Sequence, residues 1–251
     1  MIILLLPGWG YGKDVWQPLA NKLANDGTLQ FIDWTNIQSE KEIPKRVERE
    51  LHHAEKRQQR VMIIGWSLGT LVALDMATRF PKTVERLVLF SATSCFTKKK
   101  KYPHGWDERV LKWMQRRLQT DAHSVWQQFN NQLFSGREKE MILQSERPLR
   151  TEDTVTSYIN GLEFLIRADY RKKLQQISQP TLLIHGKDDE ICPPGATTYI
   201  AKNVQARATV KMMDNVGHLP FYNKADKCYA WVKGWINHKP LETIDALEGD
   251  C

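Results

Sequence analysis

One stretch of the chain, residues 61–77, constrains the fold more than any other. Its letters, VMIIGWSLGTLVALDMA, begin as a β-branched apolar run, pass through Gly-x-Ser-x-Gly and continue with the apolar spacing of a helix. A strand, a tight turn with a central serine and a helix form a nucleophile elbow, and Gly65 and Gly69 suit it because a side chain at either place would collide with the neighbouring backbone. We therefore expect Ser67 to stand exposed at a helix N-terminus as a nucleophile. The alternative is a glycine-rich turn without chemistry.

Buried strands and helices alternate on both sides of this elbow. We expect strands at 2–6, 29–34, 84–90, 181–185 and 208–213. We expect a helix that opens at Asp14, with its side chain as the N-cap, and further helices at 43–59, 193–203 and 223–238. The alternation predicts an α/β fold, with a mostly parallel sheet flanked by helices.

The alternation is interrupted in the middle of the chain. Residues 93–169 are polar, basic and helix-periodic, without a clear strand. This segment carries aromatic side chains that must pack against each other or against the core, namely Trp106, Trp113, Trp126, Phe129, Phe134 and Phe164. We expect one core domain formed by 1–92 and 170–251, and a helical cap, or lid, inserted at 93–169.

A serine hydroxyl is a poor nucleophile at neutral pH, so Ser67 needs a histidine base and a carboxylate that orients the base. Two later loops supply these groups. A glycine turn after a predicted strand carries Asp188, Asp189 and Glu190, and His218 follows the last predicted strand. Both loops lie at the carboxyl ends of strands, where open α/β sheets gather their sites.

Together these motifs are similar to those of the α/β-hydrolase superfamily, in which the nucleophile, the acid and the histidine follow one another in this order. The resemblance implies that Asp189 is the acid, because it fills the aspartate position of the family's G-x-x-D-x-x-x-P motif at 186–193. It implies that His218 is the base, and that the backbone N–H groups of Trp9 and Leu68 form the oxyanion hole. It implies no metal and no cofactor.

A closer resemblance covers nearly the whole chain. Its segments include PGWG at 7–10, GWSLG at 65–69, SATSCF at 91–96, GLEFL at 161–165 and DYR at 169–171. They look like the pimeloyl-acyl-carrier-protein methyl ester carboxylesterases of biotin synthesis. The resemblance implies a serine carboxylesterase that hydrolyses the methyl ester of a pimeloyl-type acyl chain on acyl carrier protein. We expect a slot between core and cap, lined by Trp9, Phe129, Leu133 and Phe134, to hold that chain.

The chain departs from these enzymes at two places. Pro7 stands where they carry histidine before Gly-Trp, and Gln127 and Gln128 stand near the position of their carrier-binding arginines. The alternative functions are a general carboxylesterase on small or medium-chain esters, and a cofactor-free haloperoxidase or C–C hydrolase with the same triad. A binding module that had lost catalysis would ordinarily lack a triad member, and this chain lacks none.

The formal net charge of +7 is concentrated in residues 98–117, which hold eight Lys or Arg. Such an excess favours an acidic partner, and acyl carrier proteins are strongly acidic. We expect the cap to bind one through Lys112, Arg116, Arg117 and Arg137. The alternative is that these charges only keep the cap soluble. No nucleic-acid-binding motif accompanies the basic segment, so nucleic acid is not an expected partner.

The remaining features predict the environment of the protein. The first six residues are apolar but lack the basic leader of a signal peptide, and no apolar run approaches the length of a membrane span. The four cysteines lie far apart without a C-x-x-C pair, which favours reduced thiols. His52 and His53 lack further metal ligands, and His185 is expected to be structural. We expect a cytoplasmic monomer that binds a small-molecule ester and no membrane.

Overall fold

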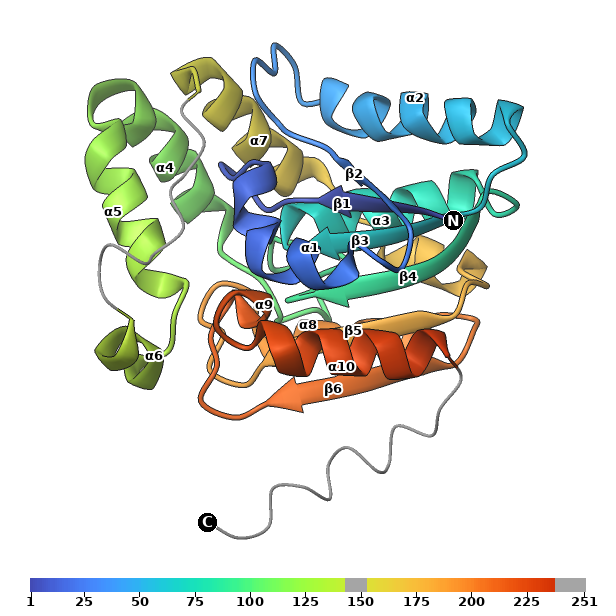
Figure 1. Cartoon of the computed structure of the whole chain (residues 1–251). Coiled ribbons are helices and arrows are strands. Elements are labelled where there is room, and N and C mark those ends of the chain that lie inside the picture. Colours follow the sequence, from blue (N-terminus) through green and yellow to red (C-terminus); the bar gives the residue numbers. More distant parts are fainter. Residues whose placement is uncertain (143–152, 238–251) are drawn as a thin grey trace, which may run out of the picture.

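The computed structural model describes residues 1–142 and 153–237. Its centre is a sheet of six parallel strands in the order β2-β1-β3-β4-β5-β6 (Figure 1). The strands are β1 (Ile2–Leu6), β2 (Thr28–Phe31), β3 (Val61–Trp66), β4 (Val84–Phe90), β5 (Thr181–Gly186) and β6 (Ala208–Met213). β1, β3 and β5 are buried along their whole length, as their mainly apolar sequences require, whereas β2 and β6 form partly exposed edges.

Helices cover both faces of the sheet (Figure 1). The core helices are α1 (Gln17–Leu23), α2 (Glu42–Lys56), α3 (Leu68–Arg79), α8 (Pro194–Asn203), α9 (Pro220–Asn223) and α10 (Ala225–Ile236). α1 and α10 pack together on one face, α3 and α8 lie on the other, and α2 packs on α3. Within residues 1–142 and 153–237, no helix combines the length and the apolar character needed to cross a membrane.

Most predicted elements are confirmed, and four differ at their ends. The helix predicted over 43–59 ends already at Lys56, since Gln58 adopts a left-handed φ of 54° just beyond it. β2 ends earlier than predicted, because the Asp33 side chain accepts the Thr35 backbone N–H at 3.0 Å and the chain turns there. Asp14 is not an N-cap, since it lies inside a 3-10 helix at Lys13–Trp16 that precedes α1. The last helix is divided into α9 and α10, which meet at Lys224.

Four helices between β4 and β5 lie beyond the carboxyl ends of the strands (Figure 1). They are α4 (Glu108–Thr120), α5 (Ala122–Gln132), α6 (Gly136–Met141) and α7 (Val155–Arg167), and we call them the cap. The two connections between cap and core run side by side, because Cys95 and Asp169 form a β-bridge and the Tyr170 N–H donates to the Ser94 carbonyl at 2.8 Å. The cap is therefore anchored next to the strand ends, where the elbow serine also lies.

Candidate active site

The turn from β3 to α3 has the geometry of a nucleophile elbow. Ser67 joins the two elements with φ 53° and ψ −115°, a strained backbone conformation for a residue with a side chain. Both glycines are required by space. A Cβ on Gly69 would lie 2.2 Å from the Leu6 carbonyl oxygen, and one on Gly65 would lie 2.9 Å from the Gly69 carbonyl oxygen. The turn thus holds Ser67 at the N-terminus of α3, as the sequence pattern predicts.

The prediction that Ser67 is exposed is wrong, because this residue keeps only 5% of its accessible surface. Apolar residues of α4, α5 and α7 line the pocket around it, so the cap closes over the elbow. The Cys192 side chain lies next to Ser67, whose hydroxyl acts to lower the pKa of that thiol. Burial and the nearby Asp189 carboxylate raise the pKa of Cys192 well above its usual range, so this thiol stays protonated and does not compete as a nucleophile.

Asp189 and His218 meet beside the elbow. The Nδ1 atom of His218 lies 2.8 Å from Oδ2 of Asp189, and both side chains are fully buried. The Trp66 indole N–H donates to the His218 carbonyl at 2.8 Å, which ties the histidine to the end of β3 next to Ser67. The other ring nitrogen, Nε2, is buried and has no hydrogen-bond partner within residues 1–142 and 153–237. This nitrogen is the one that a general base requires to be free.

The carboxylate of Asp189 accepts four hydrogen bonds. Oδ1 accepts the backbone N–H groups of Ile191 at 2.9 Å and Cys192 at 2.8 Å, and Oδ2 lies 3.0 Å from His185 Nε2 in addition to His218. Burial raises the pKa of Asp189, but the interactions with His218 and His185 outweigh this effect and hold the pKa below its usual range. The carboxylate is therefore ionised and can stabilise an imidazolium.

His185 is a fixed part of the same network. Its Nδ1 atom lies 2.6 Å from Thr197 Oγ1, and its Nε2 atom lies 2.8 Å from the Cys192 carbonyl oxygen. Because Nε2 also faces the Asp189 carboxylate, which can only accept, this nitrogen carries the proton. Asp188 and Glu190, the other acids of the turn, are exposed. In the part of the chain that the structure describes, no group of three or more His, Cys, Asp or Glu side chains is arranged to hold a metal ion.

Two backbone N–H groups near Ser67 find no acceptor in residues 1–142 and 153–237. Trp9 follows β1 and Leu68 opens α3, and neither donates a backbone hydrogen bond to the residues that the structure describes. The N-terminus of α3 adds a partial positive charge at this point. These are the two donors that the family resemblance implies for an oxyanion hole.

A small apolar cavity of about 10 Å³ borders Ser67. It is lined by side chains of the core and of the cap, namely Trp9, Phe96, Trp106, Leu111, Met114, Phe129, Leu162, Leu165 and Ile191. Trp9 and Phe129 were predicted to line such a slot. The residues from α4 and α7 were missed, although Leu111 with Met114 and Leu162 with Leu165 show the three-residue spacing of an apolar helix face.

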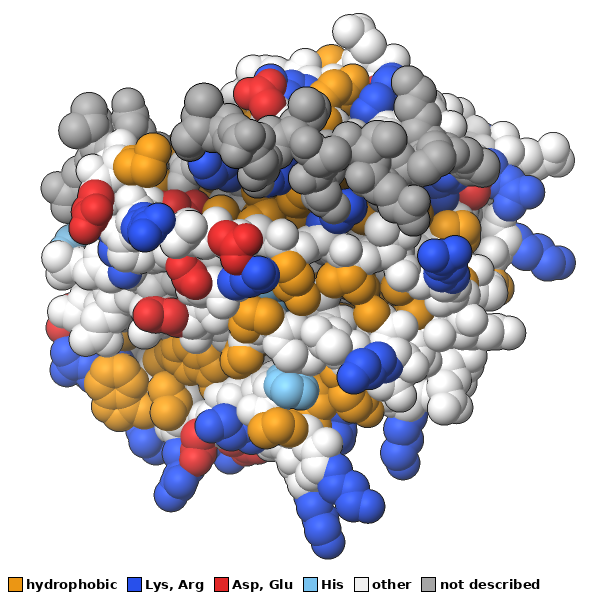
Figure 2. All heavy atoms as spheres, turned by 90° about the horizontal axis from the view of Figure 1, so that it is seen from below, with side chains coloured by type: hydrophobic (Ala, Val, Ile, Leu, Met, Phe, Trp, Pro, Cys, Tyr) orange, Lys and Arg blue, Asp and Glu red, His pale blue; other side chains and the backbone are white. Residues whose placement is uncertain are grey.

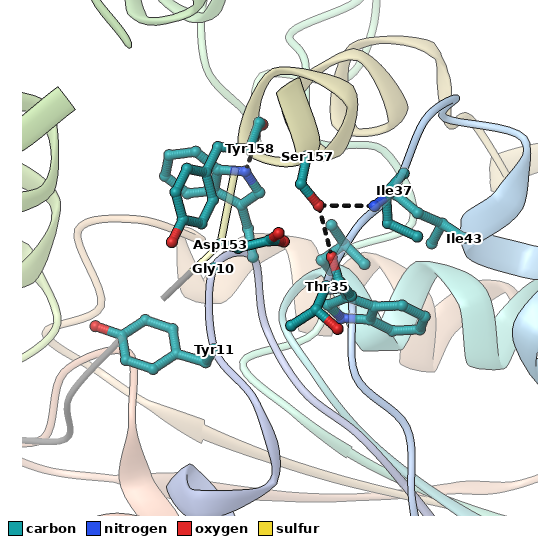
Figure 3. A pocket seen from close by; sticks show the side chains of 12 residues that line it. Gly10, Tyr11, Thr35, Ile37, Ile43, Asp153, Ser157 and Tyr158 are labelled. Atoms are coloured by element: carbon teal, nitrogen blue, oxygen red, sulfur yellow. Dashed lines mark hydrogen bonds between the residues drawn. The ribbon is translucent and has the colours of Figure 1, made fainter. Parts of the chain in front are cut away.

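Trp9 separates this pocket from a second one, which Figure 3 shows. Its indole N–H donates to the Tyr158 carbonyl at 2.9 Å. Ser157 donates from its hydroxyl to the Trp34 carbonyl and accepts the Ile37 backbone N–H, both at 2.9 Å, so that α7 is joined to the loop after β2 (Figure 3). The bond to the Tyr158 carbonyl fixes the orientation of the Trp9 ring.

Leu133 and Phe134 line neither of these two pockets. Both are buried behind the histidine: the Leu133 carbonyl accepts the His218 backbone N–H at 2.7 Å, and the Phe134 ring lies 6.3 Å from the Tyr222 ring. The structure therefore places them beside the loop that carries His218 and not beside Ser67.

The two faces of α4 differ in polarity. Leu111, Met114 and Leu118 are buried, whereas Arg109, Lys112 and Arg116 are exposed. Three cations on or near this helix are paired, at 2.7 Å each: Arg109 with Asp107, Lys112 with Glu108 and Arg117 with Asp121. Arg116 has no ion pair with any residue that the structure describes. Among the residues that the structure describes, the charge of the helix that no ion pair neutralises is thus concentrated at Arg116, near the exposed Trp113.

Arg137 does not extend this patch. It lies on α6, which follows the far end of α5 as seen from α4 (Figure 1). An 11-residue helix such as α5 is about 16 Å long. Figure 2 shows one face of the molecule, on which Lys and Arg side chains project along the lower edge of the view.

Comparisons with known proteins agree with this geometry. Residues 2–225 match the family model of the α/β-hydrolase fold. The pimeloyl-[acyl-carrier protein] methyl ester esterase of Nitrosomonas europaea is 28% identical over 230 residues, which cover 87% of this chain and 89% of that protein. The enzyme of the same name from Nitrosospira multiformis is 30% identical over 241 residues, which cover 91% of each chain.

Solved structures are similar over nearly the whole chain. An esterase from Exiguobacterium antarcticum has a TM-score of 0.83 at 20% identity and covers 94% of this chain, with 92% of its own chain matched. A bromoperoxidase from Bacillus anthracis has a TM-score of 0.81 at 16% identity and covers 94% of this chain, with 91% of its own matched. At such identities these neighbours establish the fold and not the reaction.

Proposed function

The chain belongs to the α/β-hydrolase fold family and is a carboxylic ester hydrolase, and from this premise we propose that it hydrolyses the methyl ester of a pimeloyl-type acyl chain on acyl carrier protein, in biotin biosynthesis. The observation that carries the proposal is the Asp189–His218 pair beside Ser67, under an apolar pocket. The names of the curated relatives support the substrate.

In the first half of the reaction, the Ser67 hydroxyl attacks the carbonyl carbon of the methyl ester. His218 Nε2 takes the serine proton, and the ionised Asp189 stabilises the imidazolium that results. The N–H groups of Trp9 and Leu68 stabilise the oxyanion, an effect worth about 3 kcal/mol per donor in other hydrolases. The imidazolium then returns the proton to the leaving oxygen, so methanol departs and an acyl-serine remains.

In the second half, water replaces methanol. His218 takes a proton from the water as it attacks the acyl-serine, and then gives that proton to Ser67 Oγ as the ester bond breaks. The products are the free carboxylic acid, still attached to its carrier at the other end, and the regenerated serine. Each step moves one proton through the same nitrogen, so a single base serves both halves.

The lining of the pocket supports an acyl chain made of methylene groups, which must push cap side chains apart to enter because the cavity itself is only about 10 Å³. Its lining is aromatic and aliphatic, and each methylene group that it removes from water contributes about 0.8 kcal/mol. The methyl group that leaves as methanol is small and needs little space of its own. The exposed Arg116 and Trp113 on α4 support an acidic partner that docks on the cap above this pocket.

The test compares two substrates that share the reacting group: a pimeloyl methyl ester linked to acyl carrier protein, and a free methyl ester of the same chain length. We expect Ser67→Ala to abolish methanol release from both, and wild-type kcat/KM to be higher for the carrier-linked ester. Equal kcat/KM values would indicate a general carboxylesterase. Unchanged rates in Ser67→Ala would remove Ser67 as the nucleophile.

A further inference from the structure

The carboxylate of Glu138 is buried inside the cap, with 5% of the residue exposed. It begins as part of a capping box: the Ser135 side chain accepts the Glu138 backbone N–H, and Glu138 Oε2 accepts the Ser135 backbone N–H at 2.8 Å. A capping box needs nothing more. Glu138 forms two additional hydrogen bonds: Oε2 also accepts the Gly217 backbone N–H at 2.7 Å, and Oε1 accepts from Asn223 Nδ2 at 3.1 Å.

Gly217 is the residue before His218, so this hydrogen bond joins the cap to the catalytic loop. Two further bonds run between the same segments. The Leu133 carbonyl accepts the His218 backbone N–H at 2.7 Å, and the Ser135 hydroxyl donates to the Asn215 carbonyl at 2.8 Å. Residues 133–138 thus hold the loop after β6 through three hydrogen bonds, at Asn215, Gly217 and His218.

The two segments are in van der Waals contact as well. A Cβ at position 217 would lie 2.6 Å from the Leu133 carbonyl oxygen and 2.8 Å from the Ser135 nitrogen, so only glycine allows this approach. Asn215, two residues earlier, has φ 58°, a conformation that needs support from its surroundings. The loop has little freedom while the contacts with the cap hold.

The core fixes His218 from the opposite side. Its carbonyl accepts from the Trp66 indole and from the Ser91 hydroxyl, both at 2.8 Å. The core therefore holds the carbonyl of His218, and the cap holds its N–H and the N–H of Gly217. Catalysis requires the imidazole to keep Nδ1 on Asp189 and to bring Nε2 within reach of the Ser67 hydroxyl at the same time, so both supports of the loop bear on its orientation.

We propose that Glu138 is a positioning residue: it holds the loop of the catalytic histidine through the Gly217 N–H, and so makes the catalytic geometry depend on the closed cap. This inference rests on the proposed esterase function. Glu138 accepts its three hydrogen bonds from neutral N–H donors, in Ser135, Gly217 and Asn223. The length of the Glu138 side chain therefore matters more than its negative charge.

Two variants of Glu138 separate the effect of side-chain length from the effect of charge. Glu138→Gln keeps the length, and its amide oxygen can accept from Ser135 and Gly217 while Asn223 turns its own oxygen toward the new NH₂ group. Glu138→Asp keeps the charge but is shorter by about 1.5 Å. We expect Glu138→Gln to stay close to wild type and Glu138→Asp to lose about 10- to 100-fold in kcat on p-nitrophenyl acetate, with KM nearly unchanged.

Thr154→Ala is the matched control. It removes the N-cap of α7, which accepts the Ser157 N–H, from the same cap, and the hydrogen bonds of Thr154 with described residues stay within 153–158 and do not reach the His218 loop. We expect it to lower the Tm and to leave kcat near wild type. The proton NMR signal of His218 Nδ1–H, bound to Asp189, should be lost or broadened in Glu138→Asp and kept in Thr154→Ala.

The outcomes separate the inference from the function on which it rests. Wild-type kcat in Glu138→Asp, or a greater loss in Glu138→Gln than in Glu138→Asp, would overturn the positioning role. Equal losses of kcat in Glu138→Asp and Thr154→Ala would assign the effect to cap stability alone and would also overturn it. An inactive wild-type enzyme would overturn the esterase function instead.

Discussion

At the scale of single residues, the Asp189 carboxylate carries more of the site than any other group, because two backbone N–H groups and two histidines converge on it. We predict that Asp189→Asn lowers kcat by about 10⁴-fold. The amide cannot accept at both ends, so its NH₂ group must face either the backbone N–H groups or His218. In the second case it favours the wrong tautomer of the histidine. Hydrolysis of p-nitrophenyl butyrate measures the loss.

The neighbouring acids provide the controls for this substitution. Asp188 and Glu190 are exposed on the same turn, and replacing an exposed residue changes little. We expect Asp188→Asn and Glu190→Gln to stay within about twofold of the wild-type kcat. If either variant matched the loss of Asp189→Asn, the acid would have been assigned to the wrong residue.

At the scale of secondary-structure elements, two phenylalanines at the end of α5 and just beyond it have different environments. Phe129 lines the pocket at Ser67, whereas Phe134 is buried near Tyr222, behind the histidine loop. We predict that Phe129→Ala raises KM about tenfold for a medium-chain methyl ester and little for an acetate ester, because only the longer chain reaches the ring that the substitution removes.

Phe134→Ala is the control for that prediction. It should cost about 3 kcal/mol of folding stability, as the loss of a buried aromatic ring does, without a preference for one chain length. Denaturant unfolding measures the first effect, and the ratio of the two KM values measures the second. If Phe129→Ala changed both KM values alike, its ring would be packing only.

The elements formed by local patterns were predictable from the sequence. The elbow follows from Gly65, Ser67 and Gly69, and the strands at 84–90 and 208–213 begin and end where their apolar runs do. These features depend on residues close together in the chain. The pairing of Asp189 with His218 followed from the family resemblance and from the rule that strand carboxyl ends share one edge, whereas the order of the strands was not predicted.

The features that the sequence did not predict depend on contacts between segments far apart in the chain. The burial of Ser67, the place of Leu133 behind His218, and the reach of Glu138 to Gly217 are set by how the cap folds back on the core. A glutamate three residues after a serine predicts a capping box and nothing about a loop some eighty residues later. The tertiary packing of the cap therefore determines these features, and local sequence patterns do not encode it.

At the scale of the whole molecule, the cap has two different surfaces. Its inner surface is apolar and closes the pocket over Ser67, while the outer face of α4 carries Arg109, Lys112 and Arg116. Ion pairs on the cap already neutralise Lys112 and Arg117. Arg116 has no such pair among the described residues, so we expect it to contribute most to the attraction of an acidic carrier protein.

The prediction that follows uses charge reversal. Arg116→Glu should lower kcat/KM for a carrier-linked methyl ester about fivefold and leave kcat/KM for a free ester unchanged, because long-range charge affects the encounter with the carrier and not the chemistry. Raising the salt concentration from physiological toward 1 M shortens the Debye length from about 8 Å to about 3 Å and should lower wild-type kcat/KM on the carrier-linked ester in the same way.

The response of Arg116→Glu to salt is the sharper measurement. In this variant the carrier is no longer attracted at position 116, so kcat/KM should fall less steeply with added salt than it does in wild type. Arg137→Glu is the matched control, since it reverses one exposed charge on α6, away from α4 (Figure 1). Equal losses in both variants would mean that only net charge matters. A loss on the free ester as well would mean that Arg116 supports the cap itself, and the docking surface would have to lie elsewhere.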